Sequence, residues 1–436
     1  MEARRPGDEV LDVIVQVAPA RHALPPTPPV RWLFAATLAV ASLIAVVGGL
    51  PLGFLAATDW VVDRRWTEAV QAHGRLQLFA WAAPVVIALA FEFLPRLNER
   101  PFLPGWPRVT VLAVLVAGAF LQAIALVFRI DGLMLPGTAL VLAAAVAFGA
   151  AVVHMRYRGP LTANPQALFF PAAAAWLMVA AGIAVASELR LDAQIVPLDD
   201  SRLMIEVFAR GFLLHAIVGV ALRAFPGHLD VADVPNGRQW VMLAGLSLSL
   251  AVWALGAGGL GRGDDEVLRR AGDITLAATI VVSTAWLGVL SSPRKWFAGP
   301  IYALLVPVAW LGLVVYAGVL AAVAFAGSPA ELTLWEEGAA RHALLLGFVA
   351  PLILAMAYIV LDHFGIGRIV NERLLGIAFV LLVVALPLRV VPMVAQDAPD
   401  DAARALLGAA GVVAMAAFAL AALVFARTAL AIRRAG

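Results

Sequence analysis

Two histidines that lie far apart in the sequence, His73 and His342, are the residues of this chain best suited to chemistry. Each stands at the start of a long apolar segment. Two neutral imidazoles at similar depth on different helices can bind the iron of a b-type haem from its two sides. The same positions are also compatible with ordinary interfacial histidines, which present an apolar body and a polar tip.

The composition limits which other ligands and partners are available. The 436 residues include seven histidines and nine methionines but no cysteine. The lack of cysteine excludes disulfides, cysteine-ligated iron–sulfur clusters, covalent c-type haem attachment and thiol nucleophiles. The 31 basic and 29 acidic residues nearly balance, so the net charge gives no reason to expect a nucleic-acid partner.

Three further polar residues, Glu206, Arg210 and His215, fall within a single apolar segment. An ionisable side chain at the centre of a membrane helix costs about 2.5–3.5 kcal/mol on insertion scales, so each needs a partner or a function. Glu206 and Arg210 are one helical turn apart and are expected to form an ion pair. His215 is either a candidate metal ligand or a packed residue that forms hydrogen bonds to a neighbouring helix.

Membrane helices must position these residues, because the composition excludes a water-soluble fold. Hydrophobic residues make up 63% of the chain and charged residues 14%, and the mean hydropathy is +0.92. Barrel-type alternation is absent, so the sequence predicts an all-α polytopic membrane protein of about twelve transmembrane helices. Uncharged apolar runs place these helices near 32–57, 76–95, 108–128, 133–154, 167–187, 203–225, 240–260, 274–291, 300–326, 342–363, 374–393 and 405–426.

The connections between the spans predict the orientation of the chain. Residues 1–30 form an N-terminal arm that does not resemble a cleavable signal peptide, and 31–436 form one transmembrane domain. Lys and Arg gather in the connections on the side of this arm, whereas acidic residues such as Asp264, Asp265 and Glu266 fall on the other side. The positive-inside rule therefore predicts that both termini are cytoplasmic.

A weak internal repeat relates three of the spans. His73 and His342 are each followed six positions later by a phenylalanine, and segment 209–214 parallels segment 340–345. The second, sixth and tenth spans would then be equivalent helices in three four-helix units, near 31–155, 166–291 and 300–430. In this register Gly211 takes the place of the histidine in the sixth span.

Two of these spans resemble a known family. The sequence HGRLQLFAW from His73, running on to FLPR at 93–96, resembles the second helix of NnrS-type membrane haem proteins. The sequence HALLLG from His342, followed by ILAM at 353–356 and GIGR at 365–368, resembles the tenth helix of that family. These proteins are distant relatives of haem–copper oxidase subunit I.

The resemblance implies a haem–copper oxidase-like bundle with a pseudo-threefold arrangement, in which His73 and His342 hold haem b. It implies a location in the bacterial inner membrane and a role in nitric oxide metabolism, the nitrosative stress response or electron transfer. The partners would be haem, membrane lipid and a diatomic gas or an electron donor. Arg75, Gln77 and Arg341 are expected to support the haem or bind its propionates, since arginine suits carboxylates.

The chain also departs from the oxidases. Arg75 stands where family members often have a second histidine, Ala340 replaces the first histidine of the His-x-His pair, and the seventh span has no histidine. A complete oxygen-reducing centre is therefore not expected. A remnant copper ligand at His215 is left open, because one imidazole alone makes a poor copper site, and so is an oxidoreductase-like activity. The alternative is a cofactor-free transporter or scaffold in which Glu206, Arg210 and His215 line a substrate route.

Overall fold

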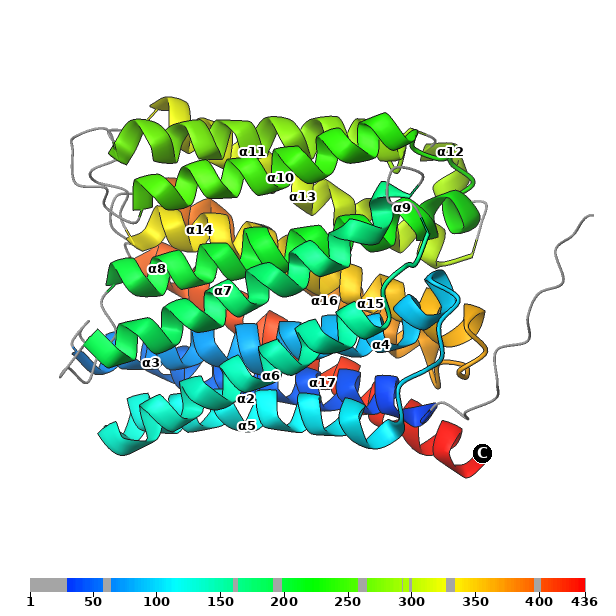
Figure 1. Cartoon of the computed structure of the whole chain (residues 1–436). Helices are drawn as coiled ribbons and strands as arrows, with labels where there is room; N and C mark the ends of the chain where they lie inside the picture. Colours follow the sequence, from blue (N-terminus) through cyan, green and yellow to red (C-terminus); the bar gives the residue numbers. More distant parts are fainter. Residues whose placement is uncertain are drawn as a thin grey trace, which may run out of the picture.

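The computed structural model describes residues 30–57, 64–159, 164–190, 198–257, 265–291, 293–297, 300–326, 334–395 and 401–435. Every regular element within these ranges is a helix, and the long helices run side by side as one bundle (Figure 1). The predicted N-terminal arm lies outside the described residues except for Val30. The α-helices are α2 (Trp32–Ala57), α3 (Arg64–Arg75), α4 (Ala83–Leu97), α5 (Gly105–Phe128), α6 (Met134–His154), α7 (Phe169–Arg190), α8 (Leu198–Glu206), α9 (Leu214–Leu229), α10 (Asn236–Ala257), α11 (Asp265–Leu287), α12 (Pro293–Trp296), α13 (Tyr302–Ala326), α14 (Leu334–Leu344), α15 (Ala350–Tyr358), α16 (Glu372–Ala395) and α17 (Asp401–Ala435).

Eleven helical spans of the described chain are long and apolar enough to cross a membrane. The protein is therefore an all-α, multi-pass membrane protein, as the composition predicts. The predicted eighth span, near 274–291, falls on α11, which is 23 residues long and packs beside α10 and α13. It is not among the eleven, because its first turns carry several charged residues, including Glu266, Arg269 and Asp273.

Three of the eleven spans form the interior of the bundle. In the most apolar stretch of Trp66–Leu97, 94% of the residues are buried, and the value is 83% in both Asp200–Leu229 and Gly338–Asp362. In the other eight spans the buried share lies between 33% and 50%. The inner spans are thus surrounded by protein, whereas the outer ones turn much of their apolar surface outward, as lipid-facing helices do.

Each inner span is interrupted by a π-helical turn. These turns are η1 (Leu76–Ala82), η5 (Val207–Leu213) and η7 (Leu345–Val349), and the last inner span has a second one, η8 (Ile359–His363). Among the described outer spans no such turn occurs. π-turns inside α-helices are rare and are frequent at functional sites, so their concentration in the three inner spans marks the interior as the place to look for function.

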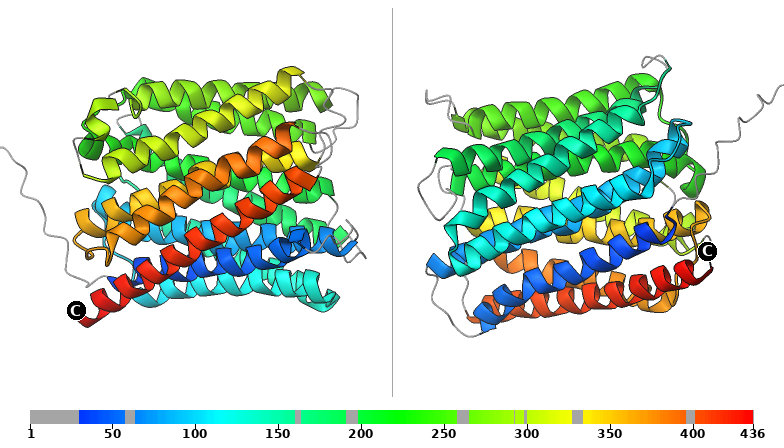
Figure 2. Two further views of the ribbon diagram at one scale, coloured as in Figure 1. Left: turned by 180° about the vertical axis from the view of Figure 1, so that it is seen from behind. Right: turned by 60° about the horizontal axis from the view of Figure 1, so that its bottom comes forward.

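The outer helices form three groups of three neighbours: α5, α6 and α7; α10, α11 and α13; and α16, α17 and α2. The last group brings the first and last long helices of the chain side by side (Figure 2). The first and last described residues lie at the same end of the bundle (Figure 1). One contact between the layers requires a glycine: a Cβ on Gly312 of α13 would collide with the backbone of Gly347 in η7.

Candidate functional site

His73 lies in the last turn of α3, immediately before the π-turn η1. Its Nδ1 lies 2.9 Å from the carbonyl oxygen of Gly48 in α2. A carbonyl only accepts, so Nδ1 carries the proton and donates this hydrogen bond. The two helices approach closely here, because a Cβ on Gly48 would press against Leu76 and Gln77. Nε2 of His73 is therefore the nitrogen that keeps a free lone pair.

Gln77 lies one turn beyond His73 on the same face of the helix. Its Nε2 donates to the carbonyl oxygen of Ala45 in α2 at 3.1 Å. The two side chains together tie α3 and η1 to α2 and fix the ring of His73. Gln77, predicted to support a cofactor, is thus directed toward the α2 backbone.

His342 lies near the end of α14, three residues before the π-turn η7 begins. Its Nδ1 donates to the carbonyl oxygen of Gly338, one turn earlier, at 2.6 Å. This leaves Nε2 as the nitrogen with the lone pair, as in His73. No hydrogen bond between described residues uses Nε2 of either histidine. Histidines that bind metals almost always donate their other ring nitrogen in this way.

The structure brings the two histidines together with a third residue, Arg389 of α16. His342 lies within electrostatic range of both His73 and Arg389, and His73 also lies within range of Arg389. Nε of Arg389 is buried and has no hydrogen-bond partner. No described carboxylate balances its charge. The sequence gives no signal that Arg389 lies beside the two histidines, because it comes from a different helix far along the chain.

Arg75 and Arg341, two predicted partners of the cofactor, lie elsewhere. Arg75 is 2% exposed and donates to Oε1 of Gln122 in α5 at 3.0 Å. It follows His73 by two residues, which is about 200° around a helix, so it points away from His342. Arg341 donates through Nε to Oε1 of Glu206 at 3.2 Å.

Glu206, Arg210, Asp273 and Arg341 form a second polar group, called here the ion cluster. Arg210 donates to Oε2 of Glu206 at 2.7 Å, which confirms the predicted pair, and also to Asp273 of α11. The guanidinium of Arg210 lies 4.9 Å from the ring centroid of Trp253. The two acids and two bases cancel, so the cluster is electrically balanced. The sequence gives no signal that Asp273 belongs to this cluster, because it lies on another helix, 63 residues from Arg210.

His215 lies in α9 and is fully buried. Its Nδ1 is 2.6 Å from the carbonyl oxygen of Gly211, and its Nε2 is 2.9 Å from Oγ of Ser247 in α10. Both ring nitrogens are therefore engaged, and neither has a free lone pair for a metal in this arrangement. Within the described ranges, no group of three or more His, Asp or Glu side chains is arranged to hold a metal ion.

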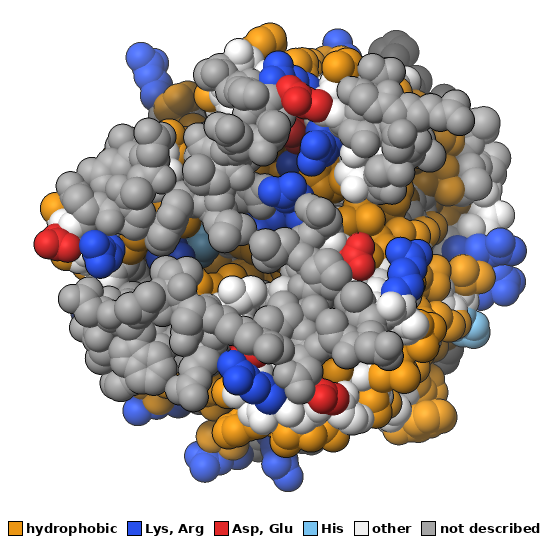
Figure 3. Space-filling model, turned by 90° about the vertical axis from the view of Figure 1, so that its left-hand side faces the viewer, with side chains coloured by type: hydrophobic (Ala, Val, Ile, Leu, Met, Phe, Trp, Pro, Cys, Tyr) orange, Lys and Arg blue, Asp and Glu red, His pale blue; other side chains and the backbone are white. Residues whose placement is uncertain are grey.

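The histidines belong to the end of the bundle where α3, α8 and α14 begin. Figure 3 views the molecule from this end, and it shows several basic side chains and, deeper among them, a histidine. A cofactor suited to His73, His342 and Arg389 needs two axial positions for imidazole nitrogens and an anionic group for a guanidinium. Haem b has both, as iron and propionates. Neither a protein-family model nor a curated protein matches this chain.

Proposed function

We propose that this chain is a haem-b-binding protein of the bacterial inner membrane that transfers electrons, with His73 and His342 as the two axial ligands. The observation that carries the proposal is the state of the two imidazoles. Each donates Nδ1–H to a backbone carbonyl and keeps Nε2 free, and the two lie within electrostatic range of each other. When bound, haem would supply a one-electron couple.

Arg389 completes this assignment by binding a propionate. A guanidinium inside a bundle needs a counter-charge, and no described carboxylate supplies one. A propionate would accept from the Nε that lacks a partner. Arg75, Gln77 and Arg341 act indirectly, since their contacts hold the surrounding helices.

The haem–copper oxidase-like, pseudo-threefold bundle is part of the same proposal. It is supported by three inner spans with π-turns and three groups of three outer helices. A twelfth crossing by α11 is supported by its place beside α10 and by the chain ends at one end of the bundle (Figure 1), which require an even number of crossings. The basic connections on that side support a cytoplasmic location for both termini.

The resemblance to NnrS-type proteins connects this electron transfer with nitric oxide metabolism or the nitrosative stress response. A haem with both axial positions filled has no open site for a gas, so electron transfer is the simpler role. A copper site at His215 has little support, because both its nitrogens are engaged. A transport route through Glu206 and Arg210 has little support, because they are paired in the ion cluster.

Purification from cells supplied with haem tests the proposal. The unmodified protein is expected to be red with a Soret absorption band, and His73→Ala and His342→Ala are expected to lose it. His228→Ala is the control, because His228 packs on Tyr302 in another part of the molecule. A colourless protein, or a band that survives both substitutions, would contradict the proposal.

A further inference from the structure

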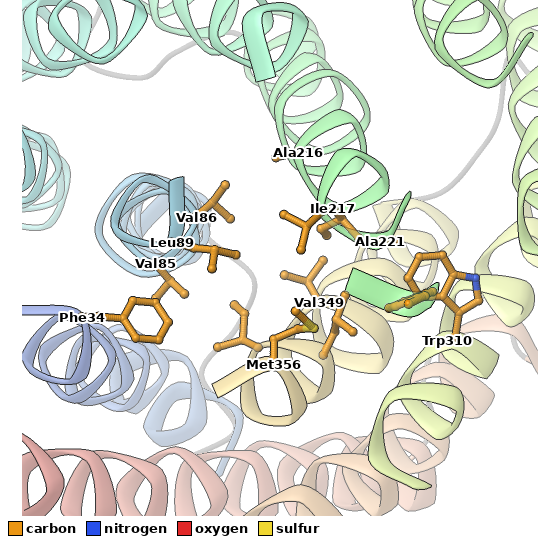
Figure 4. A pocket seen from close by; sticks show the side chains of 14 residues that line it. Phe34, Val85, Val86, Leu89, Ala216, Ile217, Ala221, Trp310, Val349 and Met356 are labelled. Atoms are coloured by element: carbon orange, nitrogen blue, oxygen red, sulfur yellow. The ribbon is translucent and has the colours of Figure 1, made fainter. Parts of the chain in front are cut away.

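A cavity of about 50 Å³ lies where the three inner spans converge (Figure 4). Side chains from α4, α9 and the last inner span point into it, and Phe34 of α2 and Trp310 of α13 close it at opposite sides. The three inner spans contribute, among others, Val85 and Leu89, Ile217 and Ala221, and Val349 and Met356.

The lining of this cavity offers nothing to a polar ligand. All 14 lining side chains are apolar apart from the indole N–H of Trp310, and that group donates to Oγ1 of Thr284 at 2.9 Å. A water molecule needs about 10–15 Å³ of such volume and two to four polar partners. The cavity exceeds this size several-fold but provides no free partner. It is therefore unfavourable for water and large enough for a small apolar molecule.

The cavity is separate from the histidine pair. Val85 follows His73 by twelve residues, which corresponds to about 18 Å along a helix, and Val349 follows His342 by seven, which corresponds to about 10 Å. Buried aromatic rings fill the intervening level: Phe79 contacts Phe208, and Phe348 contacts Trp310, with ring centroids 5.3 Å and 5.2 Å apart. A molecule in the cavity would therefore lie beyond this aromatic layer and would not depend on haem.

We propose that this cavity is a binding site for an apolar molecule of diatomic size, such as a dissolved gas. An apolar molecule gains by leaving water for an apolar environment, and it displaces no hydrogen-bonded water from a poorly hydrated cavity. The size of the cavity decides the class of ligand, because a volume that accepts a diatomic molecule is too small for a drug-sized compound.

Xenon is a suitable probe, since it binds dry apolar cavities and is located by its anomalous scattering. Crystals of the haem-loaded protein under xenon pressure are expected to contain a xenon atom between Val85, Ile217 and Val349. The filling variant Ala216→Val is expected to lose this atom. Ala147→Val is the matched control, because Ala147 is exposed on the outer helix α6.

The absence of xenon from the cavity of the unmodified protein would overturn this proposal. A xenon peak that persists unchanged in Ala216→Val would overturn it as well. If Ala216→Val does not fold, Ile217→Phe replaces it as the filling variant. A xenon site in a colourless preparation would support the cavity and contradict the haem proposal, so the two failures are distinguishable.

Discussion

The last inner span takes part in two polar sites through neighbouring residues, and the two sites differ in how far their polar groups are paired. On one side, Arg341 joins the ion cluster, in which two acids and two bases balance. On the other side, His342 lies within electrostatic range of His73 and Arg389, and Nε2 of each imidazole and Nε of Arg389 have no hydrogen bond to a described residue. Every charged group of the first site has a partner of opposite charge, whereas the second keeps polar atoms for which we propose a ligand.

This difference indicates a structural role for the ion cluster, whereas we propose a functional role for the other site. Buried polar groups in native proteins are almost always hydrogen-bonded, so each exception calls for an explanation. The ion cluster needs none, because its members hold the sixth, tenth and eighth predicted spans together. For the site of His73, His342 and Arg389, the proposed haem would supply a metal for the imidazoles and an anion for the guanidinium.

The spacing between a polar residue and a phenylalanine is the same in all three inner spans. Glu206 precedes Phe212 by six residues, as His73 precedes Phe79 and His342 precedes Phe348. This register aligns the π-turn of each inner span and puts Glu206, rather than Gly211, at the place of a third histidine. A carboxylate with two arginine partners therefore occupies the position that corresponds to His73 and His342 in the other two spans.

The largest effect on stability is expected from breaking the ion cluster. Glu206→Gln leaves Arg210 and Arg341 with one carboxylate fewer, and removing one partner of a buried pair costs about 3–5 kcal/mol. The free energy of unfolding, measured in mixed detergent micelles, is expected to fall by this order, whereas the Soret band of the folded fraction stays unchanged.

Asp401→Asn is the control for that experiment. Asp401 pairs with Arg404 at 3.4 Å but is almost fully exposed, and such pairs contribute about 0–1 kcal/mol. A Glu206→Gln protein as stable as this control would show that the ion cluster does not stabilise the fold.

A smaller effect is expected from Arg389→Gln, which removes the guanidinium from the site of His73 and His342. Loss of a nearby positive charge favours the oxidised, more positive haem, so the reduction potential is expected to fall. At an intermediate dielectric constant, the loss of this charge changes the free energy of haem reduction by about 1–2 kcal/mol. A potentiometric titration followed by the Soret band measures it.

Arg389→Lys keeps the charge and is expected to retain most of the potential, although it loses the planar donor geometry. An unchanged reduction potential in Arg389→Gln would mean that this arginine does not lie near the haem and that other residues bind the haem propionates.

The smallest effect concerns an exposed pair at the other end of the bundle, Asp230 and Lys295, whose side chains lie 2.6 Å apart. The Lys295 ammonium lowers the pKa of Asp230 from its ordinary value. Stability from this pair is therefore present above the ordinary pKa of aspartate, and it is lost as the pH falls through the lowered value. Comparing the melting temperatures of the unmodified protein and Asp230→Asn across this range measures it.

The difference in melting temperature is expected to be small near neutral pH and to disappear in acid. A difference that grows as the pH falls would contradict the assigned direction of the pKa change.

The sequence predicted the helices well, because lipid requires long apolar runs whose ends can be read from composition alone. The span predicted near 274–291 also falls on a helix, α11, although this helix begins earlier, at Asp265, in charged turns that are not part of an uncharged apolar run. The pair of Glu206 and Arg210 was also predictable, because its members are one turn apart. The partners Asp273 and Arg389 were not, since they come from helices whose packing no local spacing reveals.

Electron paramagnetic resonance of the oxidised, haem-loaded protein tests the central assignment most directly, because it reports the axial ligands of ferric iron. We expect a single low-spin ferric signal typical of two imidazole ligands, which changes to high spin or vanishes in His342→Ala. A high-spin signal in the unmodified protein, or a bis-imidazole signal that His342→Ala leaves intact, would contradict the pairing of His73 with His342.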